Sequence, residues 1–130
     1  MRTEDVVRRF LDAVEARDCD TVADCFTTSA TYANIPHPPA VGPAAIRAVF
    51  ERILPRCDQV RWDLVSSAYD GARAWLERVD RFWIGGREYA IECNGVFTVD
   101  PGKARLRDVR DYIDLATWRG RLGGVLDEPA

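Results

Sequence analysis

The amino-acid sequence predicts an α+β fold: three N-terminal helices packed on a strongly curved, mixed or antiparallel sheet that encloses an internal pocket. Two patterns predict this order. Apolar residues recur at helical spacing up to about residue 53, whereas from Gln59 onward they form strand-like runs. These runs are divided by three turn signals, Asp70-Gly71, Gly85-Gly86 and Asp100-Pro101-Gly102. Helices followed by a meander of strands are typical of an α+β domain.

The first helix is expected to begin at Thr3, a candidate N-cap, and to end near Arg17. Five apolar residues at helical spacing predict its buried face: Val6, Val7, Phe10, Leu11 and Val14. A short second helix, with Asp20 as its candidate cap, should end before residues 27–29. The third helix should begin at Gly42-Pro43, because proline is tolerated in a first helical turn, and should bury Ile46, Val49, Phe50 and Ile53.

A short strand over residues 30–35 is expected between the second and third helices. It should end at a loop, Pro36-His37-Pro38-Pro39, because proline cannot donate an amide hydrogen bond and restricts the residue before it. The four later strands are expected over residues 59–69, 72–83, 87–99 and 104–115. We expect residues 1–130 to form a single domain, with a glycine-rich tail, about residues 119–130, that is loosely ordered.

The composition excludes several classes of function. The 130 residues carry 21 acidic and 18 basic side chains, a net charge of -3 that gives no general attraction to nucleic acid or to an anionic membrane. No apolar run is long enough to span a membrane, and the N-terminus lacks an apolar signal region. Four cysteines without a C-x-x-C pair and a single histidine, His37, do not form a usual metal-binding pattern. We expect a cytoplasmic protein with reduced thiols and without nucleic-acid or membrane partners.

Charged residues interrupt two apolar strand faces. Side chains two apart on a strand share a face, so Arg78 and Asp80 lie with Leu76 and Phe82. The same count places Asp111 on the otherwise apolar face of the last strand. A lone carboxylate in an apolar setting is costly unless it is paired, hydrogen-bonded or protonated. Asp111 is therefore the residue that most needs a structural or functional reason.

Two interpretations of these residues stay open on the pattern alone. Arg78 and Asp111 can form a buried structural ion pair with Asp80 at its rim. Alternatively, they converge on a pocket with Tyr32 and Asn34, which share a face of the first strand and add polar groups to it.

The same residues carry a resemblance to the limonene-1,2-epoxide hydrolases. The resemblance reaches from the first helix to about Leu115, and its segments match in order and approximate spacing. These segments are Tyr32-Ala33-Asn34-Ile35-Pro36, Pro38-Pro39 with Gly42, Glu77-Arg78-Val79-Asp80, Gly95-Val96-Phe97 and Arg110-Asp111-Tyr112-Ile113-Asp114-Leu115. The resemblance implies the cone-shaped fold shared with nuclear transport factor and ketosteroid isomerase. It also implies a homodimer, with Trp75 and Trp83 on the outer face of the sheet.

The resemblance further implies that Asp80, Arg78 and Asp111 open an epoxide with water, without a metal or organic cofactor. Asp111 would be the base and Asp80 the acid, with Tyr32 and Asn34 as further holders of the water. Two carboxyl groups in opposite protonation states can deliver one proton and remove another. The predicted substrate is a small to medium apolar epoxide, which becomes a vicinal diol.

Five residues are predicted to line the substrate pocket beside the Asp-Arg-Asp set: Leu76, Phe82, Ile91, Cys93 and Ile113. Two other functions remain open for the same chain. An epoxide-opening cyclase of polyketide or polyether biosynthesis needs the same acid and base but uses a substrate hydroxyl as nucleophile. A non-catalytic binding module would keep the fold and its polar residues only for structure.

Overall fold

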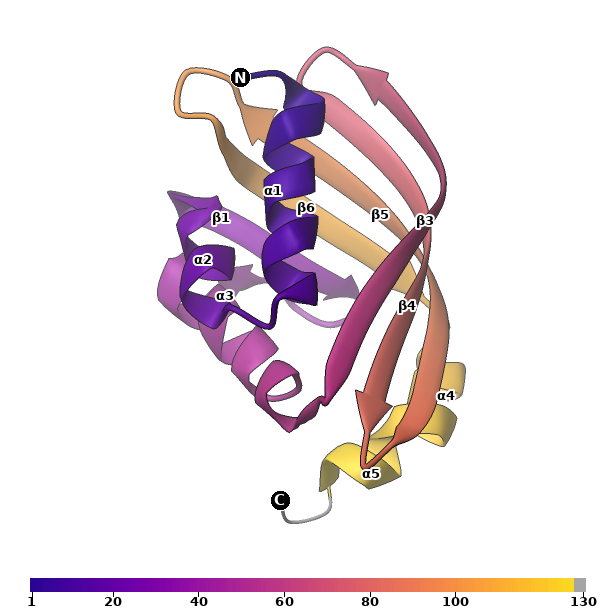
Figure 1. The fold of residues 1–130 in the computed structure, drawn as a ribbon. Coiled ribbons are helices and arrows are strands. Elements are labelled where there is room, and N and C mark those ends of the chain that lie inside the picture. The colour runs from indigo at the N-terminus through magenta and orange to yellow at the C-terminus, as the bar shows by residue number, and fades with distance from the viewer. Residues whose placement is uncertain (128–130) are drawn as a thin grey trace.

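The structure, a computed structural model, describes residues 1–127 and shows helices packed beside one six-stranded sheet (Figure 1). The helices of the first half are α1 (Thr3–Glu15), α2 (Cys19–Asp24) and α3 (Pro43–Glu51), followed by the 3-10 turn η1 (Leu54–Arg56). The strands are β1 (Phe26–Ile35), β2 (Ala40–Val41), β3 (Gln59–Asp70), β4 (Arg73–Ile84), β5 (Arg87–Asp100) and β6 (Arg105–Ile113). The predicted α+β class and the order of its main elements are confirmed.

The sheet has the strand order β2-β1-β6-β5-β4-β3 and is mixed. β1 runs parallel to β6, because the chain returns to it only after the meander, and every other neighbouring pair is antiparallel. The sheet curves around α1, which lies against its concave face (Figure 1). The core between helix and sheet includes Phe10 and Phe97, both fully buried. This concave inner face is where the predicted polar residues lie.

The helix ends differ from the expectations by one to two residues. Arg2, rather than Thr3, is the N-cap of α1, and the carboxylate of Asp5 accepts a hydrogen bond from the Arg2 amide at 3.1 Å. Asp18, rather than Asp20, caps α2, because its carboxylate accepts from the amide of Thr21 at 3.1 Å. Helix ends depend on such local caps, which apolar spacing alone does not locate.

The strand ends also differ from the sequence pattern, and pairing explains why. β1 begins at Phe26, four residues before its expected start, because Phe26 pairs with Leu106 of β6 across an irregularity in register. β6 ends at Ile113 rather than at Leu115. The next residue, Asp114, caps a following helix by accepting from the amide of Thr117 at 3.0 Å.

The C-terminal segment forms short helical turns that the sequence pattern did not predict. After α4 (Leu115–Trp118), residues 119–127 form a π-helical turn, η2 (Arg119–Gly123), and α5 (Gly124–Asp127). Leu122 is fully buried in the core, and Trp118 packs edge-on against Phe82 at 6.1 Å. Arg56 donates to the carbonyl oxygens of Val125 and Leu126 at 3.0 and 2.6 Å. These contacts hold the segment against the domain, and its glycine content does not reveal them. The expected loosely ordered tail also includes residues 128–130, which lie outside the described residues.

No helix among residues 1–127 is long and apolar enough to cross a membrane.

Candidate active site

Two strands place Arg78, Asp80 and Asp111 on the inner face of the sheet. β4 contributes Arg78 and Asp80, and β6 contributes Asp111. β5 lies between them, and its Gly95 pairs with Asp111 in the register of β5 and β6. Arg78 therefore reaches across β5 to meet Asp111.

One guanidinium group joins the two aspartates. Arg78 Nε and Nη2 donate to the two carboxylate oxygens of Asp80, both at 2.9 Å. Arg78 Nη1 and Nη2 donate to the two carboxylate oxygens of Asp111, at 3.2 and 3.1 Å. Bidentate contacts of this kind fix both the distance and the orientation of a carboxylate. The structure thus brings the predicted Asp-Arg-Asp set together.

Tyr32 also joins this set, whereas Asn34 stays beside it. The Tyr32 hydroxyl donates to Asp111 Oδ2 at 2.7 Å. Asn34 pairs with Asp111 in the parallel register of β1 and β6, and its half-buried side chain makes no hydrogen bond to another residue within 1–127. Asp111 consequently accepts hydrogen bonds from two nitrogens of Arg78 and from Tyr32.

The guanidinium and both carboxyl groups are buried. The side chains of Arg78, Asp80 and Asp111 are 0%, 7% and 3% exposed. Burial raises the pKa of Asp80 to about 6, against the opposing effect of Arg78. Burial and the nearby charge of Asp111 raise the pKa of the Tyr32 hydroxyl well above its usual value, so that it remains a donor. One guanidinium beside two carboxylates is net negative, and protonation of Asp80 makes this buried group neutral.

Because Gly95 has no side chain, Arg78 and Asp111 have room to meet beside it. A Cβ atom at this position would lie 2.7 Å from Arg78 Nη1 and 2.8 Å from Asp111 Oδ1. It would also lie 2.8 Å from Cε1 of Phe97. The sequence contained a signal for this role, because a glycine inside a strand often marks a close approach of other groups. In the sequence, Gly95 was noted only within Gly95-Val96-Phe97, one of the segments that resemble the limonene-1,2-epoxide hydrolases.

Trp62 is a second neighbour that the sequence analysis did not single out. It pairs with Asp80 in the register of β3 and β4, and the Arg78 guanidinium lies 4.4 Å from the centre of its ring. This is a cation–π arrangement, which stabilises a buried guanidinium. The alternation of Val60, Trp62 and Leu64 along β3 places Trp62 on the inner face, and this alternation was the available signal.

The predicted pocket residues lie around the set on the inner face. Leu76, Phe82, Ile91 and Cys93 are buried, and Ile113 is partly buried against the core. Arg78 Nη2 also donates to Cys93 Sγ at 3.2 Å. Burial raises the pKa of the Cys93 thiol far above its usual value, which disfavours a thiolate nucleophile.

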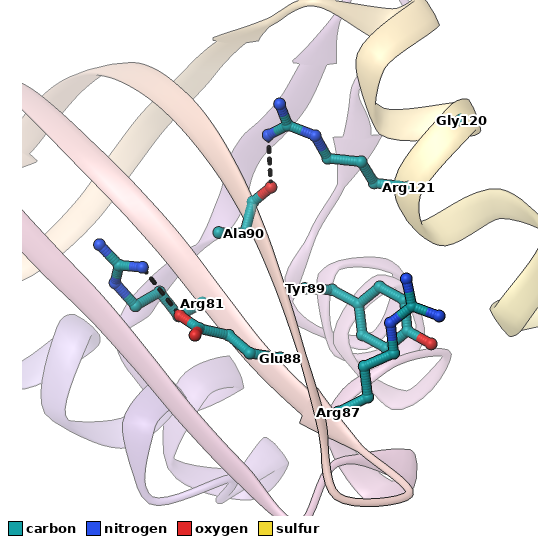
Figure 2. A pocket seen from close by; sticks show the side chains of 7 residues that line it. All are labelled: Arg81, Arg87, Glu88, Tyr89, Ala90, Gly120 and Arg121. Atoms are coloured by element: carbon teal, nitrogen blue, oxygen red, sulfur yellow. Dashed lines mark hydrogen bonds and ion pairs between the residues drawn. The ribbon is translucent and has the colours of Figure 1, made fainter.

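A surface cavity of about 420 Å³ lies between the β4–β5 hairpin and the C-terminal segment (Figure 2). Two arginines that line this cavity make hydrogen bonds within the protein. Arg81 Nη1 donates to Glu88 Oε1 at 2.8 Å, and Arg121 Nη1 donates to the Ala90 carbonyl oxygen at 2.7 Å. A second cavity, of about 490 Å³, lies beside α2 and the start of β1. Neither of these two cavities is lined by a predicted site residue, and the side chains of Arg78, Asp80 and Asp111 are buried.

Residues 1–127 contain no group of three or more histidine, cysteine, aspartate or glutamate side chains that could hold a metal ion.

Comparisons with solved structures find the same fold in proteins of several kinds. A LEH-like epoxide hydrolase of M. tuberculosis is 27% identical, with a TM-score of 0.78 over 95% of this chain and 92% of that chain. A Shewanella denitrificans protein named for the SnoaL-like polyketide cyclases is 14% identical, with a TM-score of 0.80 over 94% and 97% of the two chains. A Catenulispora acidiphila protein with a ketosteroid isomerase-like fold is 16% identical, with a TM-score of 0.77 over 96% and 97%. The likeness to the last two shows the fold alone.

The profile of the SnoaL-like domain matches residues 7–106. The chain therefore belongs to the SnoaL-like domain family, and its resemblance to the limonene-1,2-epoxide hydrolases is confirmed.

Proposed function

We propose that this SnoaL-like protein is an epoxide hydrolase that adds water to a small or medium-sized, mainly apolar epoxide and releases a vicinal diol. The observation that carries the proposal is a single buried guanidinium bound to two buried carboxyl groups, one of which has its pKa raised by burial to about 6. The 27% identity to a LEH-like epoxide hydrolase supports the same reaction class.

The contacts support different roles for the two carboxyl groups. Asp111 accepts hydrogen bonds from two nitrogens of Arg78 and from the Tyr32 hydroxyl. Asp80 is bound by Arg78 alone, and burial favours its protonated form. Asp111 is therefore suited to act as the base and Asp80 as the acid.

In the proposed reaction, Asp111 removes a proton from a water molecule held beside it, with Tyr32 and Asn34 as further polar partners. The water oxygen forms a bond to one epoxide carbon while the bond from that carbon to the ring oxygen breaks. Asp80 gives its proton to the ring oxygen. Asp111 is then protonated and Asp80 ionised, and exchange of one proton with solvent restores both groups.

The test is diol formation from a panel of terpene, styrene and steroid epoxides, measured by mass. Asp80→Asn and Asp111→Asn should each lower turnover at least about 100-fold, because a carboxamide cannot exchange the required proton. Asp63→Asn is a matched control, because Asp63 also pairs with two arginines, Arg61 and Arg81, at a partly exposed position. Near wild-type turnover by a folded Asp80 or Asp111 variant would remove that residue from the mechanism.

A single turnover with excess enzyme in water labelled with heavy oxygen tests the direct attack. Labelled diol supports attack by water, whereas unlabelled diol would show that an aspartate forms an ester with the substrate. Product mass also separates the alternatives. A product isomeric with the substrate would identify a cyclase, and no turnover of any epoxide would favour a binding module.

A further inference from the structure

Trp62 carries a buried hydrogen-bond donor that the protein leaves without an acceptor. Its side chain is in the core, and the indole Nε1 has no hydrogen-bond partner among residues 1–127. The backbone amide of Trp62, by contrast, donates to Glu15 Oε2 at 3.1 Å. One other buried side-chain nitrogen in the described chain lacks a hydrogen bond, Arg110 Nε, but it lies 3.2 Å from a carboxylate oxygen of Asp108. The indole of Trp62 is therefore the donor that needs an explanation.

The groups packed against this indole do not accept a hydrogen bond from it. Phe10, Phe50 and Phe82 surround the ring, with centroid distances of 6.1 to 6.3 Å. The Arg78 guanidinium lies over the ring and only donates. The carboxylate of Asp80, opposite Trp62 in register, has both of its oxygens bound by Arg78.

An unpaired buried donor is unfavourable by about 1–3 kcal/mol, and native proteins seldom leave one without a partner from the chain, from water or from a ligand. Trp62 lies beside Asp80, which the proposed function assigns to the epoxide oxygen, and beside Arg78. A substrate bound at those groups lies next to the indole as well.

We propose that Trp62 is a specificity-determining residue whose Nε1–H donates to a second oxygen of the substrate. The favoured substrates are then epoxides that carry an ether, hydroxyl or carbonyl oxygen besides the epoxide ring, rather than plain hydrocarbon epoxides. The inference rests on the proposed function for the reaction and adds the class of substrate. The epoxide oxygen itself is the partner of Asp80, which leaves the indole for the second oxygen.

The first test compares two epoxides that differ in one atom, cyclohexene oxide and 3,4-epoxytetrahydropyran, in which a ring oxygen replaces one CH2 group. Trp62→Phe keeps an aromatic face for Arg78 and removes the donor. The ratio of kcat/KM for the ether epoxide to that for the hydrocarbon should fall about 5- to 10-fold in Trp62→Phe, as expected for one lost hydrogen bond between neutral groups. Trp75→Phe makes the same change at an exposed position and should leave the ratio unchanged.

The second test measures binding without turnover. In a ¹H–¹⁵N spectrum, the indole signal of Trp62 is identified by its absence from Trp62→Phe. Tetrahydropyran should move this signal downfield, and cyclohexane should not. The inference is overturned if tetrahydropyran leaves the signal in place, or if Trp62→Phe lowers kcat/KM for both epoxides equally, as donation to the epoxide oxygen or to a water molecule would predict. If the wild type hydrolyses neither epoxide, the proposed function fails on these substrates, while the indole signal still decides the role of Trp62.

Discussion

Gly95→Ala tests whether the close approach of Arg78 and Asp111 depends on the absence of a side chain in β5. The added Cβ would meet Arg78 Nη1 at 2.7 Å and Asp111 Oδ1 at 2.8 Å, distances that real Cβ contacts essentially never show. It would also meet the ring of Phe97 at 2.8 Å. Arg78 and Phe97 are fully buried, so neither can move into solvent to relieve the contact.

The expected change in the free energy of unfolding of Gly95→Ala follows from two opposing effects. Overpacking of a buried site typically destabilises the folded state by about 1–3 kcal/mol. Replacing glycine by alanine restricts the unfolded chain, which offsets about 0.4–1 kcal/mol of this. A net loss of about 1–2 kcal/mol is expected, which lowers Tm by roughly 3–10 °C for a domain of this size. Because Arg78 and Asp111 must separate, turnover should also fall roughly 10- to 100-fold.

Thermal unfolding followed by circular dichroism measures the first effect, and diol formation measures the second. Gly102→Ala is the control, because a Cβ there would have one ordinary contact, 3.5 Å from Asp100 Oδ1. This control should keep the Tm and the turnover of the wild type. A Gly95→Ala protein as stable and as active as the control would refute the argument that Gly95 sets the geometry of the site.

Two further predictions address the acid and the C-terminal segment. Because Asp80 must hold a proton to act as the acid and burial raises its pKa to about 6, kcat/KM should fall about tenfold per pH unit above pH 6; a flat profile from pH 6 to 8 would contradict this role. Leu122→Ala should destabilise the fold by about 2–3 kcal/mol, measured by denaturant unfolding, because Leu122 is fully buried; a change below about 0.5 kcal/mol would show that residues 119–127 contribute little to the core.

The strands and helices that have their own periodic pattern could be predicted from the sequence. The meander from β3 to β6 was found because its turns are marked by glycine and its faces alternate. The pairing of β1 with β6 could not be found in this way, because it joins Phe26 to Leu106 across most of the chain. The packing of Leu122 was missed for a similar reason, since a single leucine among glycines has no periodicity.

The predicted site depended on the alternation of side chains along a strand and on the resemblance to the limonene-1,2-epoxide hydrolases. The alternation brought Arg78 and Asp80 to the same face, whereas the resemblance implied that Asp111 joins them, and Arg78 Nη1 does donate to Asp111. The burial of the site was not predictable, because Trp62, Phe10 and Phe50 come from three separate elements. Only the folded chain brings these three rings into contact with one another.

The number of carboxyl groups bears on whether the set serves structure or chemistry. A buried arginine needs one carboxylate to neutralise its charge, and replacing a buried ion pair by apolar residues is often neutral or stabilising. Here Arg78 holds two aspartates, so the second adds a buried negative charge unless it takes up a proton. Charge balance alone does not call for the second carboxylate. A reaction that must both give and remove a proton can use both carboxyl groups, and this supports the proposed roles of Asp80 and Asp111.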